Sequence, residues 1–316
     1  MKSTKLLYFK GINLNKENIS ILKKKFLLFT IKNIASVKNI NKKDIEEISV
    51  IYCDQNFTYS SSFLNMFKNL KYLISSTTST DFIDHKYCKK NNIEIISLEN
   101  DGKFLNSITS TAEHTLGLIL LTARNYVPAI KSIDKKNFNR RPFGGYKMLS
   151  KCSLGIIGYG RLGKLVARLS KNIFKNVYYT DTKLQKKNYK KKLQIIFKNC
   201  DFITLHIKSK NNLNFFQKKN LPQIKKSFYL INTSRGEVVD ESFILKLLSE
   251  KKMLGYGTDV IKGEFTRKFD IKKNIIFKNR KKYNIVITPH IGGSTLDAWN
   301  LTEKRVITKL INKKLS

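Results

Sequence analysis

The 316-residue sequence has few of the residues that build disulfide-rich or zinc-stabilised proteins. It contains four cysteines and four histidines. No two cysteines form a C-x-x-C pair, and none lies near a histidine at the spacing of a zinc finger. We therefore expect neither a disulfide framework nor a metal site, and four scattered thiols suit a reducing compartment.

The sequence also lacks a hydrophobic run long enough to cross a membrane. Its longest apolar stretch is at residues 116–121, whereas a transmembrane helix needs roughly 20 residues. The apolar segment at residues 6–9 is too short for a signal peptide, and no small-residue cleavage site follows it. We expect a cytoplasmic protein without a membrane partner. A hydrophobic fraction of 41% predicts a folded protein, and the length is sufficient for two domains.

Acidic residues are few relative to basic ones: 23 against 61, for a net charge of +38. This charge is compatible with a nucleic acid or an anionic surface as partner, and equally with compositional drift. Arginine is scarce, and the lysine runs are spread along the chain between apolar segments instead of gathering on one element. We favour drift and expect no specific nucleic-acid partner, although the charge would attract anionic substrates.

Segments of strand length alternate with segments of helical length along the chain, which predicts an α/β fold with parallel sheets. The first series of expected strands is at residues 6–9, 48–52, 70–75 and 93–98. The second series is at residues 153–157, 176–180, 201–207, 228–232, 254–259 and 284–288. The chain therefore contains two α/β units, the second lying between residues 105 and 293.

Helix signals complete this outline. A long amphipathic helix is expected at residues 111–126, with Ser110 and Glu113 as a capping box. Asp240 is a suitable N-cap for another helix. The remaining helices are expected at residues 162–171, 190–198, 241–251 and 295–312. The last of these follows a complete second unit, so its return to the first unit would make the first domain discontinuous.

A glycine motif, G-x-G-x-x-G, lies between an apolar strand and a helical pattern, at Gly158, Gly160 and Gly163. In this context Gly158 allows a tight turn, Gly160 lets the backbone approach a pyrophosphate, and Gly163 lets helix and strand pack closely. Asp181 ends the next strand, where a carboxylate binds ribose hydroxyls and repels a 2′-phosphate. This predicts NAD rather than NADP, although Lys183 would tolerate a phosphate. The predicted contacts are Gly158, Gly160, Arg161, Leu162, Gly163 and Asp181.

Polar segments follow three of the later strands, at residues 232–236, 259–264 and 288–293. They place Arg235, Glu264 and His290 at the carboxyl ends of strands, where ligands bind in open parallel sheets. An arginine, an acid and a histidine there suggest chemistry on a carboxylate substrate. Taken singly, each has an ordinary alternative: a surface cation, a solvated acid, and a strand cap.

Together these segments resemble the D-isomer-specific 2-hydroxyacid dehydrogenase family, and in particular a divergent branch of its phosphoglycerate dehydrogenase-like enzymes. The resemblance covers most of the chain in the family's order and spacing. Besides the four segments above, it includes residues 76–84 and 111–115. It implies two doubly wound, Rossmann-like domains with a cleft between them. Residues 1–104 plus 294–316 would form a flavodoxin-like substrate domain, and residues 105–293 the NAD-binding domain.

The resemblance also implies roles for the catalytic candidates in hydride transfer between NAD(H) and C2 of a small 2-hydroxy or 2-oxo acid. Arg235 would hold the substrate carboxylate and the C2 oxygen through its planar fork. His290 would be the general acid and base, and Glu264 would orient the imidazole and favour its charged form. A homodimer built largely from the cofactor domain is implied as well. Further implied contacts are Thr78 and Ser79 for substrate, and His206, Thr233, Asp259 and Gly292 for cofactor.

Several positions depart from the family pattern. Ser79 stands where the family usually has glycine, which matters if the position needs a positive φ. The loop at residues 99–103 lacks the usual small residues, and Lys208 and Phe265 each replace a common proline. These departures leave the substrate open, with 3-phosphoglycerate-like acids among the candidates. His114, on the apolar helix, is expected to be a satisfied core or interface histidine.

Two other functions compete with the dehydrogenase. The first is a non-catalytic, NAD-sensing regulator on the same fold, which the basic charge would support, although no DNA-reading motif is visible. The second is a relative that oxidises formate. The family's formate enzymes usually replace the glutamate partner of the histidine, so Glu264 argues against that alternative.

Overall fold

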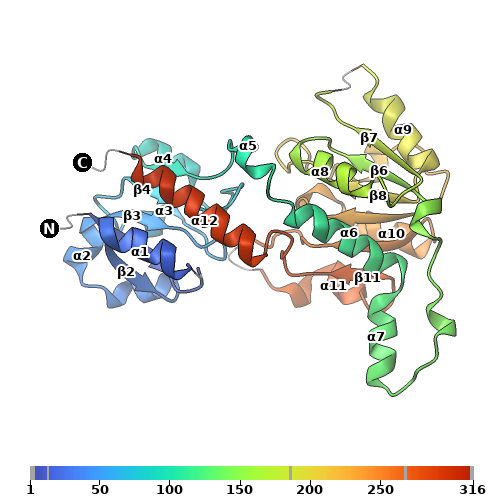
Figure 1. Cartoon of the computed structure of the whole chain (residues 1–316), viewed down its shortest axis with the longest axis horizontal. Coiled ribbons are helices and arrows are strands. Elements are labelled where there is room, and N and C mark those ends of the chain that lie inside the picture. The colour runs from blue at the N-terminus through green and yellow to red at the C-terminus, as the bar shows by residue number, and fades with distance from the viewer. Residues whose placement is uncertain (1–3, 13, 185–186, 267–268, 314–316) are drawn as a thin grey trace. The chain divides into compact units, whose positions relative to one another are not determined.

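The computed structural model describes residues 4–12, 14–184, 187–266 and 269–313. The chain divides into two compact units (Figure 1). The first comprises Met1–Ser107, Phe265–Arg267 and Ser294–Ser316, and the second comprises Ile108–Glu264 and Lys268–Gly293. The first unit is therefore discontinuous, as the sequence predicts. The division falls after residue 107 instead of 104, and a short segment from Phe265 joins the first unit instead of the second.

The first unit contains a five-stranded parallel sheet in the order β2-β1-β3-β4-β5, which is the flavodoxin-like order. Its strands are β1 (Lys5–Phe9), β2 (Leu27–Ile31), β3 (Ile48–Tyr52), β4 (Tyr72–Ile74) and β5 (Glu94–Ile96). β2 is not among the strands predicted from the sequence. The signal was present, because residues 26–31 form an apolar run with Lys25 before it and Lys32 after it, although as an edge strand β2 is only partly buried.

The C-terminal helix belongs to this first unit, as predicted. In Figure 1, α12 (Leu296–Ile311, red) lies beside α1 at the other end of the sequence. Its Val306, Ile307 and Leu310 are buried with Leu6 and Val50 of the sheet. The other helices of the unit are α1 (Lys16–Lys25), α2 (Lys42–Glu47), α3 (Ser61–Leu64), α4 (His85–Lys90) and α5 (Gly102–Leu105).

The second unit contains a six-stranded parallel sheet in the order β11-β10-β9-β8-β6-β7. The chain steps from β6 to β7 on one side and then crosses to β8 on the other, so the strand order reverses beside β6. In open α/β sheets, ligands bind outside the carboxyl ends of the strands at this switch point. The strands are β6 (Ser153–Ile157), β7 (Asn176–Thr180), β8 (Phe202–Leu205), β9 (Phe228–Asn232), β10 (Met253–Thr258) and β11 (Ile285–Ile287).

The prediction of one long helix at residues 111–126 is wrong in two respects. It ends at Ala123, and Asn125, in a left-handed conformation, separates α6 (Ser110–Ala123) from α7 (Tyr126–Asp134). Its N-cap is Thr109, whose hydroxyl donates to Glu113, so the capping box does not begin at Ser110. The other helices are α8 (Arg161–Ser170), α9 (Tyr189–Asn199), α10 (Glu241–Ser249) and α11 (Ile275–Asn279), of which α11 is not predicted.

Helices cover both faces of this second sheet, and β6, β8 and β9 are buried along their whole length. Ile157 on one face packs with Leu193 of α9, and Ile156 on the other packs with Leu165 of α8. Asp240 caps α10 by accepting from two backbone N–H groups, as predicted. Within the described ranges, no helix combines the length and apolar character needed to cross a bilayer.

Candidate active site

The glycine turn follows β6 and leads into α8. Gly158 has φ +93°, and a Cβ there would lie 2.5 Å from the carbonyl oxygen of His206. A Cβ at Gly163 would lie 2.0 Å from the carbonyl oxygen of Gly158. A Cβ at Gly160, by contrast, would meet no protein atom within 4 Å. Two of the glycines are therefore required by the fold itself, whereas the open side of Gly160 faces space that a ligand can fill.

The start of α8 is a site for an anion. Gly160 is the N-cap and has no side chain with which to cap the helix itself. Arg161 and Leu162 form its first turn. Beside the turn, both ring nitrogens of His206 are buried and have no hydrogen-bond partner among the described residues. Burial lowers the pKa of His206 to about 4, so this imidazole is neutral at pH 7.

Asp181 lies after β7 and is tied to the glycine turn. One of its carboxylate oxygens accepts from the backbone N–H of Tyr159 at 2.9 Å, and the other accepts from that of Lys183 at 2.8 Å. The Tyr159 ring stacks on Tyr179 with centroids 3.7 Å apart. A carboxylate has about four lone-pair sites, so these two bonds leave capacity for ribose hydroxyls.

The loop after β9 carries Arg235. The side-chain oxygen of the fully buried Asn232 accepts from both the backbone N–H and the hydroxyl of Ser234, and its amide donates to the carbonyl of Arg235. Nη1 of Arg235 donates to the Ser234 carbonyl at 2.7 Å. Thr233 is buried, with its hydroxyl 2.9 Å from that of Thr115 on α6. Asn232 therefore sets the shape of the loop that presents Arg235.

Gly236, the residue after Arg235, brings this loop against the loop that carries Glu264. A Cβ at Gly236 would lie 2.1 Å from the carbonyl carbon of Ile261, so only glycine allows this approach. The Glu237 carboxylate then accepts from the backbone N–H of Gly263, which has φ +79°. The Arg235 loop and the Glu264 loop are thus held together along their backbones.

Glu264 and His290 meet side chain to side chain. Nδ1 of His290 lies 3.0 Å from Oε1 of Glu264, and the two side chains are 32% and 13% exposed. His290 has φ +54°, a left-handed conformation that is uncommon for a residue with a Cβ. The two groups are within ion-pair distance, although Oε1 of Glu264 has no hydrogen-bond partner among the described residues.

Asp259, at the end of β10, holds the loop that carries His290. It is buried, and its carboxylate accepts from the hydroxyl of Thr288 and from the backbone N–H groups of Ile291 and Gly292. Burial by itself raises the pKa of Asp259. Contacts with His114 and Thr288 and the two backbone N–H groups more than offset this, so the pKa lies below its ordinary value.

The two predicted substrate contacts lie in the other unit, on the loop after β4. Ser79 donates through its hydroxyl to Asp81, and its carbonyl accepts from Thr77. Thr78 is exposed between them. Ser79 is not among the described residues with positive φ, so this backbone does not demand the glycine that the family usually has there.

Residues that the sequence analysis did not select complete the site. Glu237 holds the Glu264 loop, and Thr288 and His114 contact Asp259. A signal was present for His114, because a histidine on an otherwise apolar helix needs a polar partner. None was present for Glu237, since the sequence does not reveal which backbone N–H its carboxylate reaches.

The sequence model of the D-isomer specific 2-hydroxyacid dehydrogenase NAD-binding domain matches residues 116–292. The chain belongs to this family. It is therefore an NAD-dependent oxidoreductase that acts on the CH–OH group of a 2-hydroxy acid. The match spans the glycine turn and the three loops after β9, β10 and β11.

Relatives of known name agree with this assignment. The chain is 26% identical to the hydroxypyruvate reductase of Thermotoga maritima, over 86% of this chain and 85% of the relative. It is 33% identical to the D-3-phosphoglycerate dehydrogenase of Haemophilus influenzae, over 60% of this chain and 46% of the relative. Among solved structures, it is similar to the D-lactate dehydrogenase of Aquifex aeolicus, with a TM-score of 0.75, 24% identity and coverage of 97% and 94%.

The geometry of the second unit fits NAD. The open side of Gly160 at the start of α8 suits a pyrophosphate, which helix N-termini bind through backbone N–H groups. The Asp181 carboxylate beside the turn suits a ribose with free 2′ and 3′ hydroxyls. The unpartnered nitrogens of His206 lie next to the same turn, where a bound cofactor can give them a partner.

Proposed function

We propose that this chain interconverts a small 2-hydroxy acid and its 2-oxo acid, with Arg235, Glu264 and His290 as the catalytic residues. The observation that carries this proposal is the contact of 3.0 Å between His290 Nδ1 and Glu264 Oε1. A histidine that faces a carboxylate through one ring nitrogen is oriented to move a proton through the other. The pair lies in the unit that matches the NAD-binding domain.

The residues divide the work as follows. Arg235 binds the substrate carboxylate and the C2 oxygen with its fork of N–H donors. His290 donates a proton from Nε2 to the carbonyl oxygen during reduction and removes it during oxidation, and Glu264 stabilises the charged ring. NAD, when bound, accepts or supplies the hydride. The first unit is assigned the substrate-binding role, with Thr78 and Ser79 on the loop after β4 as contacts.

The cofactor contacts form a second set. The turn residues Gly158, Gly160 and Gly163, with Arg161 and Leu162 of α8, would bind the pyrophosphate. Asp181 would bind the adenosine ribose. His206, Thr233, Asp259 and Gly292 would line the remainder of the cofactor site.

For the substrate, we propose a 2-hydroxy acid of the 3-phosphoglycerate type. The 33% identity to a D-3-phosphoglycerate dehydrogenase supports this choice, as does a net charge of +38, which attracts a phosphorylated acid. This match covers 60% of the chain, which does not establish that the two proteins share the same substrate loop. Smaller acids are therefore tested as well.

A screen of NADH oxidation tests the proposal. Purified protein is mixed with NADH and, separately, with 3-phosphohydroxypyruvate, hydroxypyruvate, glyoxylate or pyruvate, and absorbance at the nicotinamide band is followed. We expect turnover with at least one acid and the highest kcat/KM with the phosphorylated one. Formate with NAD is included as a control, on which we expect no activity.

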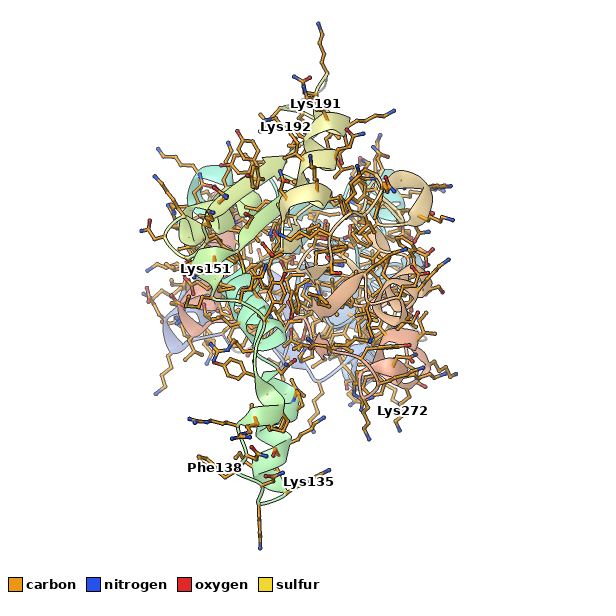
Figure 2. The ribbon with its side chains drawn as sticks, turned by 90° about the vertical axis from the view of Figure 1, so that its right-hand side faces the viewer. Lys135, Phe138, Lys151, Lys191, Lys192 and Lys272 are labelled. Atoms are coloured by element: carbon orange, nitrogen blue, oxygen red, sulfur yellow. The ribbon has the colours of Figure 1, made fainter. Side chains whose placement is uncertain are left out.

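If the protein were instead an NAD-sensing regulator, the same sample would give different results. It would bind NADH, as measured by fluorescence titration, and would turn over none of the acids. It would also be retained on DNA or heparin at physiological salt. Figure 2 shows that the labelled lysines of the second unit come from separate elements, for example Lys151 before β6, Lys191 on α9 and Lys272 before α11. This scatter favours the enzyme over the regulator.

We also propose that the protein is a homodimer that associates through α7. The helix exposes Tyr126, Ile130 and Ile133, which recur at helical spacing on one face, and Phe138 just beyond it is 96% exposed. Figure 2 shows α7 projecting from its unit, with Phe138 near its far end. An exposed apolar face of this kind marks a protein–protein contact, and homodimers are the commonest assembly.

Light scattering coupled to size-exclusion chromatography tests the dimer. The double variant I130D/I133D should elute as a monomer, while the wild type elutes at twice the chain mass. The control is Leu213→Asp, which places the same charge on an equally exposed apolar residue away from α7. A wild type that remains monomeric at concentrations of about 100 μM would refute the dimer without affecting the proposed chemistry.

A further inference from the structure

Asp259 binds the loop that carries His290 through three backbone N–H groups, and the His290 N–H also bonds to the Thr288 carbonyl at 3.0 Å. Asp259 accepts hydrogen bonds from three successive backbone N–H groups: its carbonyl oxygen from His290 at 2.9 Å, Oδ1 from Ile291 at 2.9 Å, and Oδ2 from Gly292 at 2.8 Å. Residues with a Cβ rarely adopt the left-handed backbone conformation that His290 has, so the surrounding structure has to impose it. The three bonds to Asp259 do so.

The orientation of the Asp259 carboxylate is fixed in turn from α6. Oγ1 of Thr288 donates its only hydrogen to Oδ1 of Asp259 at 2.6 Å. Nε2 of His114 lies 3.0 Å from the same hydroxyl oxygen and 3.3 Å from Oδ1. Because the hydroxyl hydrogen is already used, His114 must be the donor in its contact with Thr288. His114 therefore carries a proton on Nε2 and directs it between the hydroxyl and the carboxylate.

The packing behind the loop is tight around the Asp259 carboxylate. A Cβ at Gly292 would lie 2.9 Å from Oδ2 of Asp259, 3.3 Å from Thr111 and 3.5 Å from the His114 ring. The Asp259 side chain is only 3% exposed. Loop, carboxylate and α6 are thus in mutual contact, and a change at α6 reaches the backbone of His290 through Asp259.

We propose that His114 and Thr288 are positioning residues for His290. Through Asp259 they hold the left-handed conformation that keeps the imidazole on Glu264. This inference rests on the proposed role of His290, and it adds two residues that act on His290 through Asp259. Their effect should appear in proton transfer, and because Asp259 and Gly292 are also proposed cofactor contacts, a smaller effect on NADH binding is expected beside it.

The test uses two pairs of variants in the full-length protein. T288V and H114L remove the donors, whereas T288S and H114Q retain a hydroxyl and an N–H group. We expect T288V and H114L to lower kcat about tenfold, a larger factor than the change in the KM for NADH, and T288S and H114Q to recover most of the loss. T122V is the matched control, because the Thr122 hydroxyl is buried on the same helix and bonds only within it, to the Leu118 carbonyl.

A second measurement does not depend on turnover. The ¹⁵N resonances of the His290 ring, assigned by comparison with H290Q, report the environment of Nδ1 beside Glu264. They should shift in T288V and H114L and stay unchanged in T122V. Equal loss of kcat in T288V and T122V, or His290 resonances that do not move in T288V, would overturn the inference. A wild type without turnover would refute the proposed function instead, and the resonances would still decide the positioning role.

Discussion

The two units have the same kind of sheet, and both bury polar side chains just after strands, as Asp54 and Ser75 do in the first unit, but the first unit also buries a polar pair between helices. In the second unit, Asn232, Thr258 and Asp259 lie buried at strand ends. Asn232 and Thr258 bond to the loop that follows their own strand, and Asp259 bonds to the loop after β11. In the first unit, Asn18 of α1 and Glu303 of α12 are buried between helices, where the Asn18 amide donates to Glu303 at 3.3 Å. The Asn18 oxygen has no partner among the described residues.

The difference shows where polar burial serves function. Burying a polar group is unfavourable unless it is hydrogen bonded, and the second unit satisfies its groups with loop backbone, which fixes the loops of the candidate site. The first unit leaves one carboxyl group poorly compensated, and burial raises the pKa of Glu303 to about 7. The buried polar groups of the second unit shape the candidate site, whereas the buried Glu303 of the first unit makes helix packing sensitive to pH.

The largest effect is expected when a catalytic residue of the second unit is removed without disturbing the fold of that unit. His290→Ala should lower kcat by about a hundredfold or more, which is the usual loss when a general acid and base is removed. Because the loop is held through backbone bonds to Asp259, the melting temperature and the Kd for NADH should change little. Turnover close to that of the wild type, measured with the best acid of the screen, would remove His290 from the mechanism.

A second prediction separates the glycines that the fold needs from the one that a ligand needs. Gly163→Ala places a Cβ against backbone and should lower the free energy of unfolding by about 2 kcal/mol. Gly160→Ala places its Cβ in open space at a φ of −74°, so stability should be unchanged while NADH binding weakens. Urea unfolding and NADH titration of both variants give the comparison. Unweakened binding in Gly160→Ala would contradict the proposed pyrophosphate contact.

The second unit could be predicted from the sequence more completely than the first. Its central strands are continuous apolar runs bounded by polar residues, so all six strands are found to within two residues. In the first unit, the edge strand β2 was not predicted although its residues form an apolar run bounded by lysines. The break between α6 and α7 also escaped prediction, because a left-handed Asn125 is a local backbone choice with no periodic signature.

For the candidate site, residue types and spacing predict which side chains lie at strand ends. They do not predict how the loops are held. Three sets of contacts hold the loops: the close approach at Gly236, the Glu237 contact to Gly263, and the three bonds to Asp259. Each set joins segments that are separate in the sequence, and the sequence does not show which of their residues face each other. Tertiary packing decides these contacts, so Thr288 and Glu237 become visible only in the structure.

A third prediction concerns cofactor choice. Asp181→Ala should shift the ratio of kcat/KM for NADPH over NADH upward by about tenfold, because it removes a charge that repels a 2′-phosphate. Lys183 nearby would assist the shift. Glu250→Ala, which removes a negative charge from the surface of α10, is the control and should leave the ratio unchanged. A ratio in Asp181→Ala equal to that of the wild type would show that discrimination lies elsewhere.

The smallest expected effect belongs to the first unit and depends on pH. The pKa of Glu303 rises from 4.5 to about 7 on folding, so its neutral form stabilises the folded state fully below pH 4.5. That contribution is lost as the pH rises through 7. Glu303→Gln stays neutral and should exceed the wild type in unfolding free energy at pH 8, with the difference disappearing near pH 4.5. Trp299, the single tryptophan, lies on the same helix, so its fluorescence during urea unfolding reports the transition directly. A difference that is independent of pH would mean that Glu303 does not titrate in this range.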